Sequence, residues 1–156
     1  IALFLTLFIM NPVLTQIQQT AYEPYTRQEI TQEEAIDRAS VPLKEFMLRN
    51  TESSSLTLFC DLAGVDKPAT DEEAMELSMR VIIPSYMTSE LKAAFQIGFF
   101  LYIPFMLIDI VVSSTLMSMG MIMLPPAMIS MPFKLLLFIT VDGWQLLFST
   151  LAQGFR

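Results

Sequence analysis

The chain has 156 residues and a formal net charge of −7; 53% of its residues are hydrophobic and 16% are charged. Average soluble chains carry roughly 25% charged residues, so this composition indicates a membrane protein or a member of a large obligate assembly. The lack of histidine and the single cysteine exclude histidine-based nucleophile triads, histidine metal sites, internal disulfides and thiolate clusters. Charged residues concentrate between positions 23 and 92 without forming a basic patch, and the sequence has no Gly-rich phosphate loop, so neither a nucleic-acid partner nor a cofactor is expected.

Residues 1–14, "IALFLTLFIMNPVL", form an apolar run that predicts the end of a hydrophobic helix stopping near Asn11 and Pro12. A complete signal peptide begins with positive charge and ends at a small-residue cleavage site, and this run has neither feature. We interpret the run as the second half of a longer apolar helix.

Residues 15–87 are predicted to form a soluble, mostly helical module with a charged surface. Thr31 and Glu34 have the spacing of a capping box, in which each side chain satisfies a free amide at the start of a helix. Pro42 is expected to break or bend this helix because proline lacks an amide donor, and Ser40 is then expected to cap its second half.

The second half of this module has similar signals. Cys60 lies in a short apolar patch and is expected to pack as a small apolar residue rather than act as a reactive thiol. Thr70 and Glu73 again have capping-box spacing, and the acidic residues in the turn that follows complement the positive end of a helix dipole. Pro84 is expected to close this second helix.

Residues 88–156 are predicted to form a long helical hairpin that is apolar on both arms. The first arm, from Thr88 to Met119, has more residues than a helix needs to cross a bilayer core. The second arm, from Met131 to Phe155, has a similar length. The predicted fold class is therefore all-α, with long apolar helical hairpins and a soluble helical insert.

Both arms contain ionisable residues. Asp109 lies deep in the first arm, Lys134 opens the second, and Asp142 lies within it. Charged side chains inside a membrane are costly and normally find a partner in protein or water. A hairpin folded at residues 122–124 places position 137 opposite Asp109, within one helical turn of Lys134. The two residues are expected to pair, within one subunit or between neighbours; a lysine that merely snorkels to an interface would leave Asp109 unexplained.

Half of the 12 methionines lie between positions 117 and 131, around Pro125 and Pro126. The proline pair is expected to hold this segment out of helix, and Gly120 to supply freedom for the turn. Methionine is flexible and polarizable, so three roles are open. These are a filler of an ordinary core, a Cu(I) site weakened by the lack of histidine, and a compliant seal where several copies meet on an axis. The candidate residues of a seal are Met117, Met119, Met121, Ile122 and Met123.

The chain resembles the FliP family in three segments: "PSYMTSELKAAFQIGF" (84–99), "DIVVSSTLMSMGMIMLPPAMISMPFK" (109–134) and "VDGWQLL" (141–147). This family is the P-type, or SctR-type, core subunit of the export gate in flagellar and virulence type III secretion. The resemblance extends over essentially the whole chain and is strongest from residue 84 onward. The residues of the first and third segments resemble the flagellar members of the family more than the virulence members.

The resemblance implies a non-enzymatic channel subunit of the bacterial inner membrane, at the flagellar basal body, with the helical module projecting into the periplasm. Several copies would assemble with R-type and Q-type gate subunits into a helical, ring-like channel complex, next to the B-type subunit and in part against membrane lipid. Unfolded export substrates would pass through its centre. The hairpins would then lie largely inside the assembly, where protein satisfies their charges.

The resemblance also implies roles for particular residues. The family's constriction corresponds to Met121, Ile122 and Met123, and Ile122 replaces the methionine that many members carry. Neighbouring methionines at positions 117 and 119 would support this constriction. Asp109 and Lys134 correspond to a pair that links neighbouring subunits and sets their register.

Two alternatives come from the residues themselves. The first is a small polytopic transporter in which Asp109 and Lys134 relay ions or protons, and it would purify as a monomer or dimer. The second is a membrane scaffold without a pore, which would be indifferent to loss of the methionine side chains. A gate subunit, in contrast, requires a ring with unlike partners.

Overall fold

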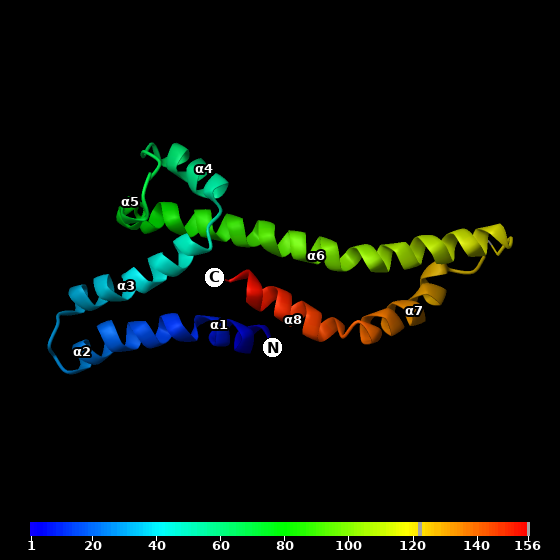
Figure 1. Ribbon diagram of the computed structural model, residues 1–156, viewed down its shortest axis with the longest axis horizontal. Helices are drawn as coiled ribbons and strands as arrows, with labels where there is room; N and C mark the ends of the chain where they lie inside the picture. Colours follow the sequence, from blue (N-terminus) through cyan, green and yellow to red (C-terminus); the bar gives the residue numbers. More distant parts are fainter. Residues whose placement is uncertain (122, 156) are drawn as a thin grey trace. The chain divides into compact units, whose positions relative to one another are not determined.

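The computed structural model describes residues 1–121 and 123–155, and these residues fold without strands, as the predicted all-α class requires. The assembly of copies into a ring stays a prediction. The helices in chain order are α1 (Ala2–Ile17), the π-helix η1 (Gln18–Tyr22), α2 (Glu23–Thr26), α3 (Gln32–Arg49), α4 (Ser53–Ala63), α5 (Asp71–Glu76), α6 (Met79–Ser118), α7 (Pro126–Thr140) and α8 (Gly143–Gly154) (Figure 1).

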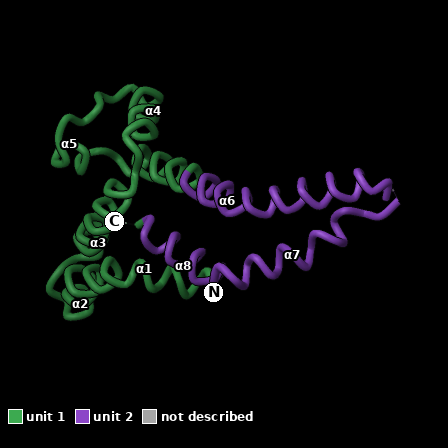
Figure 2. The backbone as a smooth tube through the Cα atoms, turned by 45° about the vertical axis from the view of Figure 1, so that its right-hand side comes forward, with its two compact units in different colours: residues 1–92, 155–156 green, residues 93–154 purple. Residues whose placement is uncertain are grey.

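Contacts within the chain divide it into two compact units (Figure 2). The first unit contains residues 1–92 together with Phe155, and the second contains residues 93–154. The boundary lies within α6, so the first turns of this helix pack with the first unit and the remainder belongs to the second. The sequence predicts a division into three parts: the end of an apolar helix, a soluble module and an apolar hairpin. This division stays a prediction.

Threonine caps begin two helices of the first unit, at the positions that capping-box spacing predicts. Thr31 Oγ1 accepts a hydrogen bond from the N–H of Glu34 at 3.3 Å, and Thr70 Oγ1 accepts one from the N–H of Glu73, also at 3.3 Å. The glutamate carboxylates bond elsewhere: that of Glu34 pairs with an arginine one turn later, and that of Glu73 accepts from the N–H of Ala69. Both helix starts are therefore determined by local side chains.

Three prolines that were predicted to end or break helices lie inside them instead. α1 continues past Pro12, α3 continues past Pro42, and α6 contains Pro84 near its start. The hydroxyl of Ser40 does not cap a second helix; it donates to the carbonyl of Asp37 within α3. Each proline removes one amide donor. A single lost hydrogen bond does not end these helices, because most helical stability in proteins comes from packing of a face.

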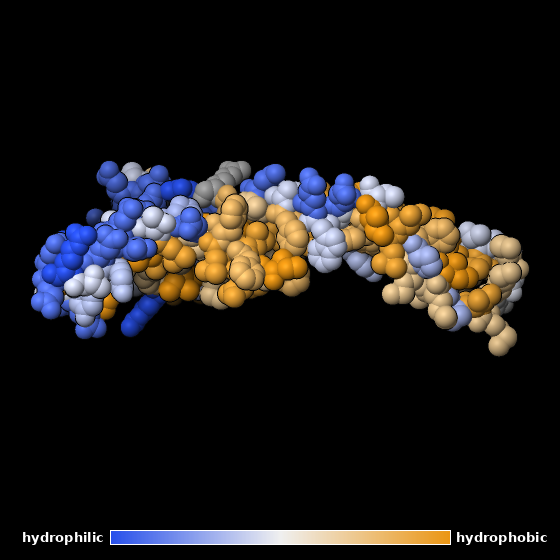
Figure 3. All heavy atoms as spheres, turned by 90° about the horizontal axis from the view of Figure 1, so that it is seen from below, coloured by the Kyte–Doolittle hydropathy of each residue, from blue (hydrophilic) through white to orange (hydrophobic). Residues whose placement is uncertain are grey.

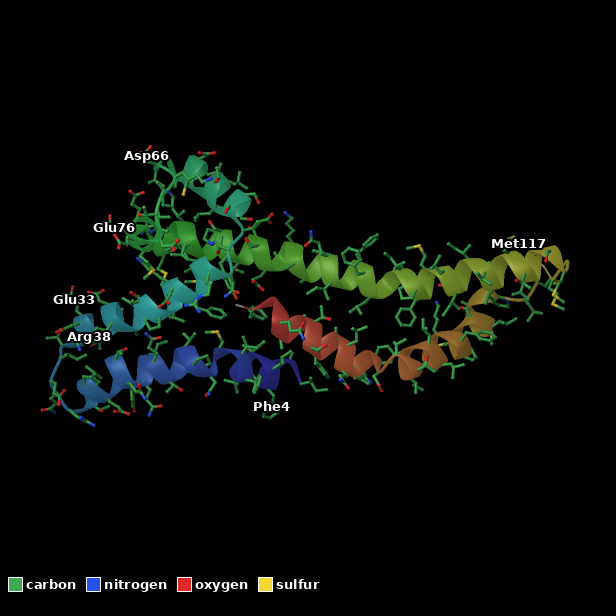
Figure 4. The ribbon with its side chains drawn as sticks, in the orientation of Figure 1. Phe4, Glu33, Arg38, Asp66, Glu76 and Met117 are labelled. Carbon is green, nitrogen blue, oxygen red and sulfur yellow. The ribbon has the colours of Figure 1, made fainter. Side chains whose placement is uncertain are left out.

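Apolar contacts join α3 to the start of α6 in the first unit. Val81 and Ile82 of α6 are buried, and Phe46 of α3 packs edge-on against Tyr86 with ring centroids 6.1 Å apart. Hydrophilic side chains gather over α2 and the start of α3 (Figure 3), and charged residues such as Glu33 lie on the outside of the helices (Figure 4). This unit thus has a small apolar core and charged residues on its surface.

Polar contacts add to this packing. Lys44 of α3 donates to the carbonyl oxygens of Met75 and Leu77, at 3.1 and 2.9 Å, and so places a positive charge at the end of α5. Lys92 of α6 donates to both carboxylate oxygens of Glu52 at 2.7 Å. This hydrogen bond lowers the pKa of the Glu52 carboxyl.

Cys60 is fully buried in α4, as the sequence predicts. Burial raises the pKa of its thiol, and the neighbouring carboxylate of Asp61 raises that pKa further. Because the thiolate is the reactive form, we expect Cys60 to react with a soluble thiol reagent at neutral pH much more slowly in the folded chain than in denaturant. Thiol titration in both conditions measures this protection. Equal rates would show that α4 opens readily and that the packing role is wrong.

The second unit contains the two apolar arms. α6 has 40 residues, so its length of about 60 Å is roughly twice the hydrocarbon thickness of a bilayer. The second arm is two helices rather than one, because α7 and α8 meet at a bend of 60°. Within the described residues, α6 is long and apolar enough to span a membrane, and α7 with α8 qualifies as one broken span. Hydrophobic residues predominate over α7 and the end of α6 (Figure 3).

Candidate functional site

The methionine turn, our name for residues 117–121 and 123–125, includes the end of α6 and precedes α7. α6 ends in a Schellman motif: the N–H of Met121 donates to the carbonyl of Leu116 at 3.0 Å, and the N–H of Gly120 donates to that of Met117 at 3.1 Å. Gly120 has a φ of 76°, in the left-handed region that glycine occupies without steric cost. Gly120 therefore ends α6.

The proline pair ends the turn. Pro125 is extended, with φ −65° and ψ 116°, and Pro126 is the first residue of α7. Proline suits the first position of a helix because its missing N–H would have no partner there. Pro125 therefore lies outside the helix, and Pro126 starts the second arm.

The methionines of the turn are exposed within the chain. Met117 lies in the last turn of α6 (Figure 4) and is 71% exposed, and Met119 is 63% exposed. Met121 and Met123 are 41% and 97% exposed. Ile122, the middle residue of the predicted constriction, lies outside the described residues. The four described thioethers therefore fill no core of this chain, and their flexible side chains can contact another molecule.

Asp109 of α6 accepts hydrogen bonds from two residues of α7, and we call Asp109, Ser130 and Lys134 the polar trio. Lys134 Nζ lies 2.6 Å from Asp109 Oδ2, and Ser130 Oγ lies 2.7 Å from Asp109 Oδ1. Ser130 is fully buried, whereas the side chains of Lys134 and Asp109 are 29% and 36% exposed. Both carboxylate oxygens thus have a donor within the chain, which compensates the charge of Asp109 in an apolar arm.

The register of the arms differs from the predicted one. Position 137 was expected opposite Asp109, but the structure brings Ser130 and Lys134 to it. The reason is that the two helices are not symmetric about residues 122–124: Asp109 lies nine residues before the end of α6, whereas Ser130 lies four residues after the start of α7. Ser130 was not among the residues predicted for this site. Its position one helical turn before Lys134, and so on the same face of α7, is the signal that could have found it.

An apolar groove of about 530 Å³ lies between α6 and α7, next to the polar trio. Its lining residues are Leu107, Ile108, Val111, Val112, Thr115 and Leu116 from α6, and Ile129 and Phe133 from α7. The two arms therefore do not pack tightly along this length. The arms are joined by the polar trio and by the rings of Phe105 and Phe138, whose centroids are 6.4 Å apart.

The corner between α7 and α8 contains the third ionisable residue of the arms. Asp142 has a φ of 49°, a conformation that aspartate tolerates better than most residues. A Cβ on Gly143 would overlap the ring of Phe138, so this close approach requires glycine. Phe138 packs edge-on against Trp144, with ring centroids 5.4 Å apart. Asp142 thus lies at a helix corner and not in the middle of a continuous arm.

The site offers two kinds of chemistry. The methionine turn presents flexible apolar side chains. The polar trio connects α6 and α7 by charge-assisted hydrogen bonds. Within the described residues, no group of three or more histidine, cysteine, aspartate or glutamate side chains is placed to hold a metal ion.

Known proteins resemble this chain along nearly its whole length. The sequence model of the FliP family matches residues 1–151. The flagellar biosynthetic protein FliP of Pectobacterium carotovorum is 52% identical over 155 residues, which are 99% of this chain and 59% of that relative. The proteins of the same name from Bacillus subtilis and Aquifex aeolicus are 49% and 45% identical, over 99% and 100% of this chain and 69% and 65% of theirs. The chain thus spans about 59% to 69% of the length of these relatives.

Proposed function

The chain belongs to the FliP family, and from this premise we propose that it is a pore-forming core subunit of the flagellar type III protein export gate. In this proposal several copies surround a passage through which unfolded export substrates leave the cytoplasm. The subunit has no enzymatic activity, and the energy for export comes from elsewhere in the apparatus.

This proposal rests on the exposure of the methionine side chains at the end of an apolar hairpin. Met123 is 97% exposed, and Met121 and Met119 are 41% and 63% exposed. Large apolar side chains in such a position favour a partner that covers them. In the proposed ring, the partner is the same turn of the other copies. Hydrophobic constrictions of this kind close a passage to ions by excluding water, and flexible thioethers yield to a passing chain.

The remaining assignments follow from the same proposal. The subunit lies in the bacterial inner membrane at the flagellar basal body, and its helical module projects into the periplasm. Its protein partners are further copies of itself and the R-type, Q-type and B-type gate subunits. Asp109 and Lys134 brace the hairpin within the chain, and we propose that they also set the register between neighbouring copies.

The alternative is a small polytopic transporter in which the same ion pair relays ions or protons. Stoichiometry separates the two functions, because a gate subunit purifies in a ring with unlike partners and the transporter as a monomer or dimer. The mass of the purified complex therefore decides between them.

Cross-linking to a stalled export substrate tests the proposed passage. In a Cys60→Ala background, we expect Met123→Cys to form a disulfide with a stalled substrate that carries a cysteine in its translocating segment. Phe95→Cys is the matched control, because Phe95 is 77% exposed but lies in α6 outside the methionine turn. Cross-linking to position 95 and not to position 123 would show that substrates do not pass the turn.

A further inference from the structure

Ser130 is the most enclosed member of the polar trio. Its side chain is fully buried, and its Oγ lies 2.7 Å from Asp109 Oδ1 and 3.3 Å from the carbonyl oxygen of Ala127 in its own helix. A serine hydroxyl has one proton to donate, and a carboxylate is the stronger acceptor. The shorter contact therefore takes the proton, and the hydroxyl donates to Asp109 across the two arms.

Serine and lysine constrain the two arms differently. The donor of Ser130 lies one bond from its Cβ, whereas Lys134 reaches Asp109 through a flexible four-carbon stem. A lysine side chain can keep its ion pair while two helices slide or separate. The short serine side chain loses its hydrogen bond when they do. The close contact of Ser130 with Asp109 therefore defines the spacing of α6 and α7 at this point.

Ser130 is also the member of the trio on α7 that lies closer to the methionine turn. It follows Pro126, the first residue of α7, by about 6 Å of helix, whereas Lys134 follows it by about 12 Å. The other end of the turn is held by the Schellman motif at Gly120. The turn is thus anchored on both sides, and the anchor on α7 is the serine.

We infer that Ser130 is a positioning residue: through Asp109, its buried hydroxyl fixes the spacing of the two arms and thereby the position of the methionine turn. The spacing is a property of the chain itself. Its effect on an ion seal rests on the proposed function.

The test measures the spacing and the seal separately. Spin labels on Ile110→Cys and Leu135→Cys, two exposed positions on α6 and α7 that do not line the groove, report the distance between the arms in a Cys60→Ala background. The distance is measured in the purified full-length chain and in the assembled gate, with labelled copies diluted among unlabelled ones. Ion leak through the gate is measured in parallel. The variants are Ser130→Ala, which removes the donor, and Ser130→Thr, which keeps it.

Ser149→Ala is the matched control. Ser149 donates to a carbonyl three residues earlier in α8, just as Ser130 contacts Ala127, but it is not part of the trio. We expect Ser130→Ala to broaden the distance distribution and to raise the fraction of separated arms roughly tenfold, since a hydrogen bond to a charged group is lost. Ser130→Thr should keep the narrow distribution, and Ser149→Ala should change nothing.

The outcomes separate the two claims. An unchanged distribution in Ser130→Ala overturns the positioning role, whether or not the chain forms a channel. A broadened distribution with increased ion leak supports both claims. A broadened distribution with unchanged leak supports the positioning role and contradicts the proposed seal.

Discussion

Replacing Met121 and Met123 together by alanine is expected to make the closed gate leak small ions. Each substitution removes the flexible thioether arm that would close the passage, and burial of apolar groups contributes about 0.8 kcal/mol per methylene. Losing the apolar contact of even two methylene groups lowers the free-energy barrier that keeps water and ions out of the passage. This decrease is enough to raise the ion leak roughly tenfold. Export should continue, because a wider passage still admits an unfolded chain. Ion flux into membrane vesicles or cells that contain the assembled gate measures the leak.

Met128 and Met131 provide the matched control for this experiment. They are 72% and 62% exposed but lie in α7, beyond the proline pair. Their double replacement by alanine removes the same number of thioethers and should leave the gate tight. An equal leak in both double variants would mean that the constriction is not at residues 121–123, and a tight gate in both would favour the scaffold without a pore.

Removal of either charge of the polar trio is expected to reduce the amount of assembled complex severalfold. Asp109→Ala leaves the Lys134 cation without its acceptor in an apolar arm, and Lys134→Ala leaves the carboxylate with the serine alone. An unpaired charge in such surroundings is costly, whereas neutral groups of similar shape are tolerated. Native gel analysis of the purified membrane complex measures assembly.

Two double variants show whether the charges act through each other. Asp109→Asn with Lys134→Met removes both charges and should assemble better than either single neutralised variant. Asp109→Lys with Lys134→Asp restores an ion pair and should recover part of the assembly. Additive defects in both double variants would mean that the two residues act independently. Normal assembly of either single variant would argue against any role of the pair in holding copies together.

The local features of this chain were predictable because neighbouring residues determine them. The threonine caps at positions 31 and 70, the glycine that ends α6 and the apolar character of both arms follow from short-range spacing. The prolines misled the prediction, since Pro12, Pro42 and Pro84 lie inside helices. The helix-breaking rule for proline considers one lost backbone hydrogen bond. It does not include the stability that a helix gains when a whole face of it packs against the rest of the protein.

The corner between α7 and α8 was predictable in part. The sequence "VDG" contains an Asp-Gly pair, which is a turn signal, but it stands in a run that is otherwise apolar and continuous. The close approach of Gly143 to the ring of Phe138 involves a contact between two helices that composition does not reveal.

The sequence by itself determined the all-helical class, the place of the methionine turn, the family and the expectation that Asp109 finds a partner near Lys134. Only the tertiary structure decided that Ser130 shares this carboxylate, that the second arm is broken and that the described methionines of the turn stay uncovered within the chain. The physical reason is that caps, turns and apolar periodicity depend on residues a few positions apart. The partners of a side chain across a hairpin depend on where the first helix ends, and a shift of one residue there rotates every later side chain to another face.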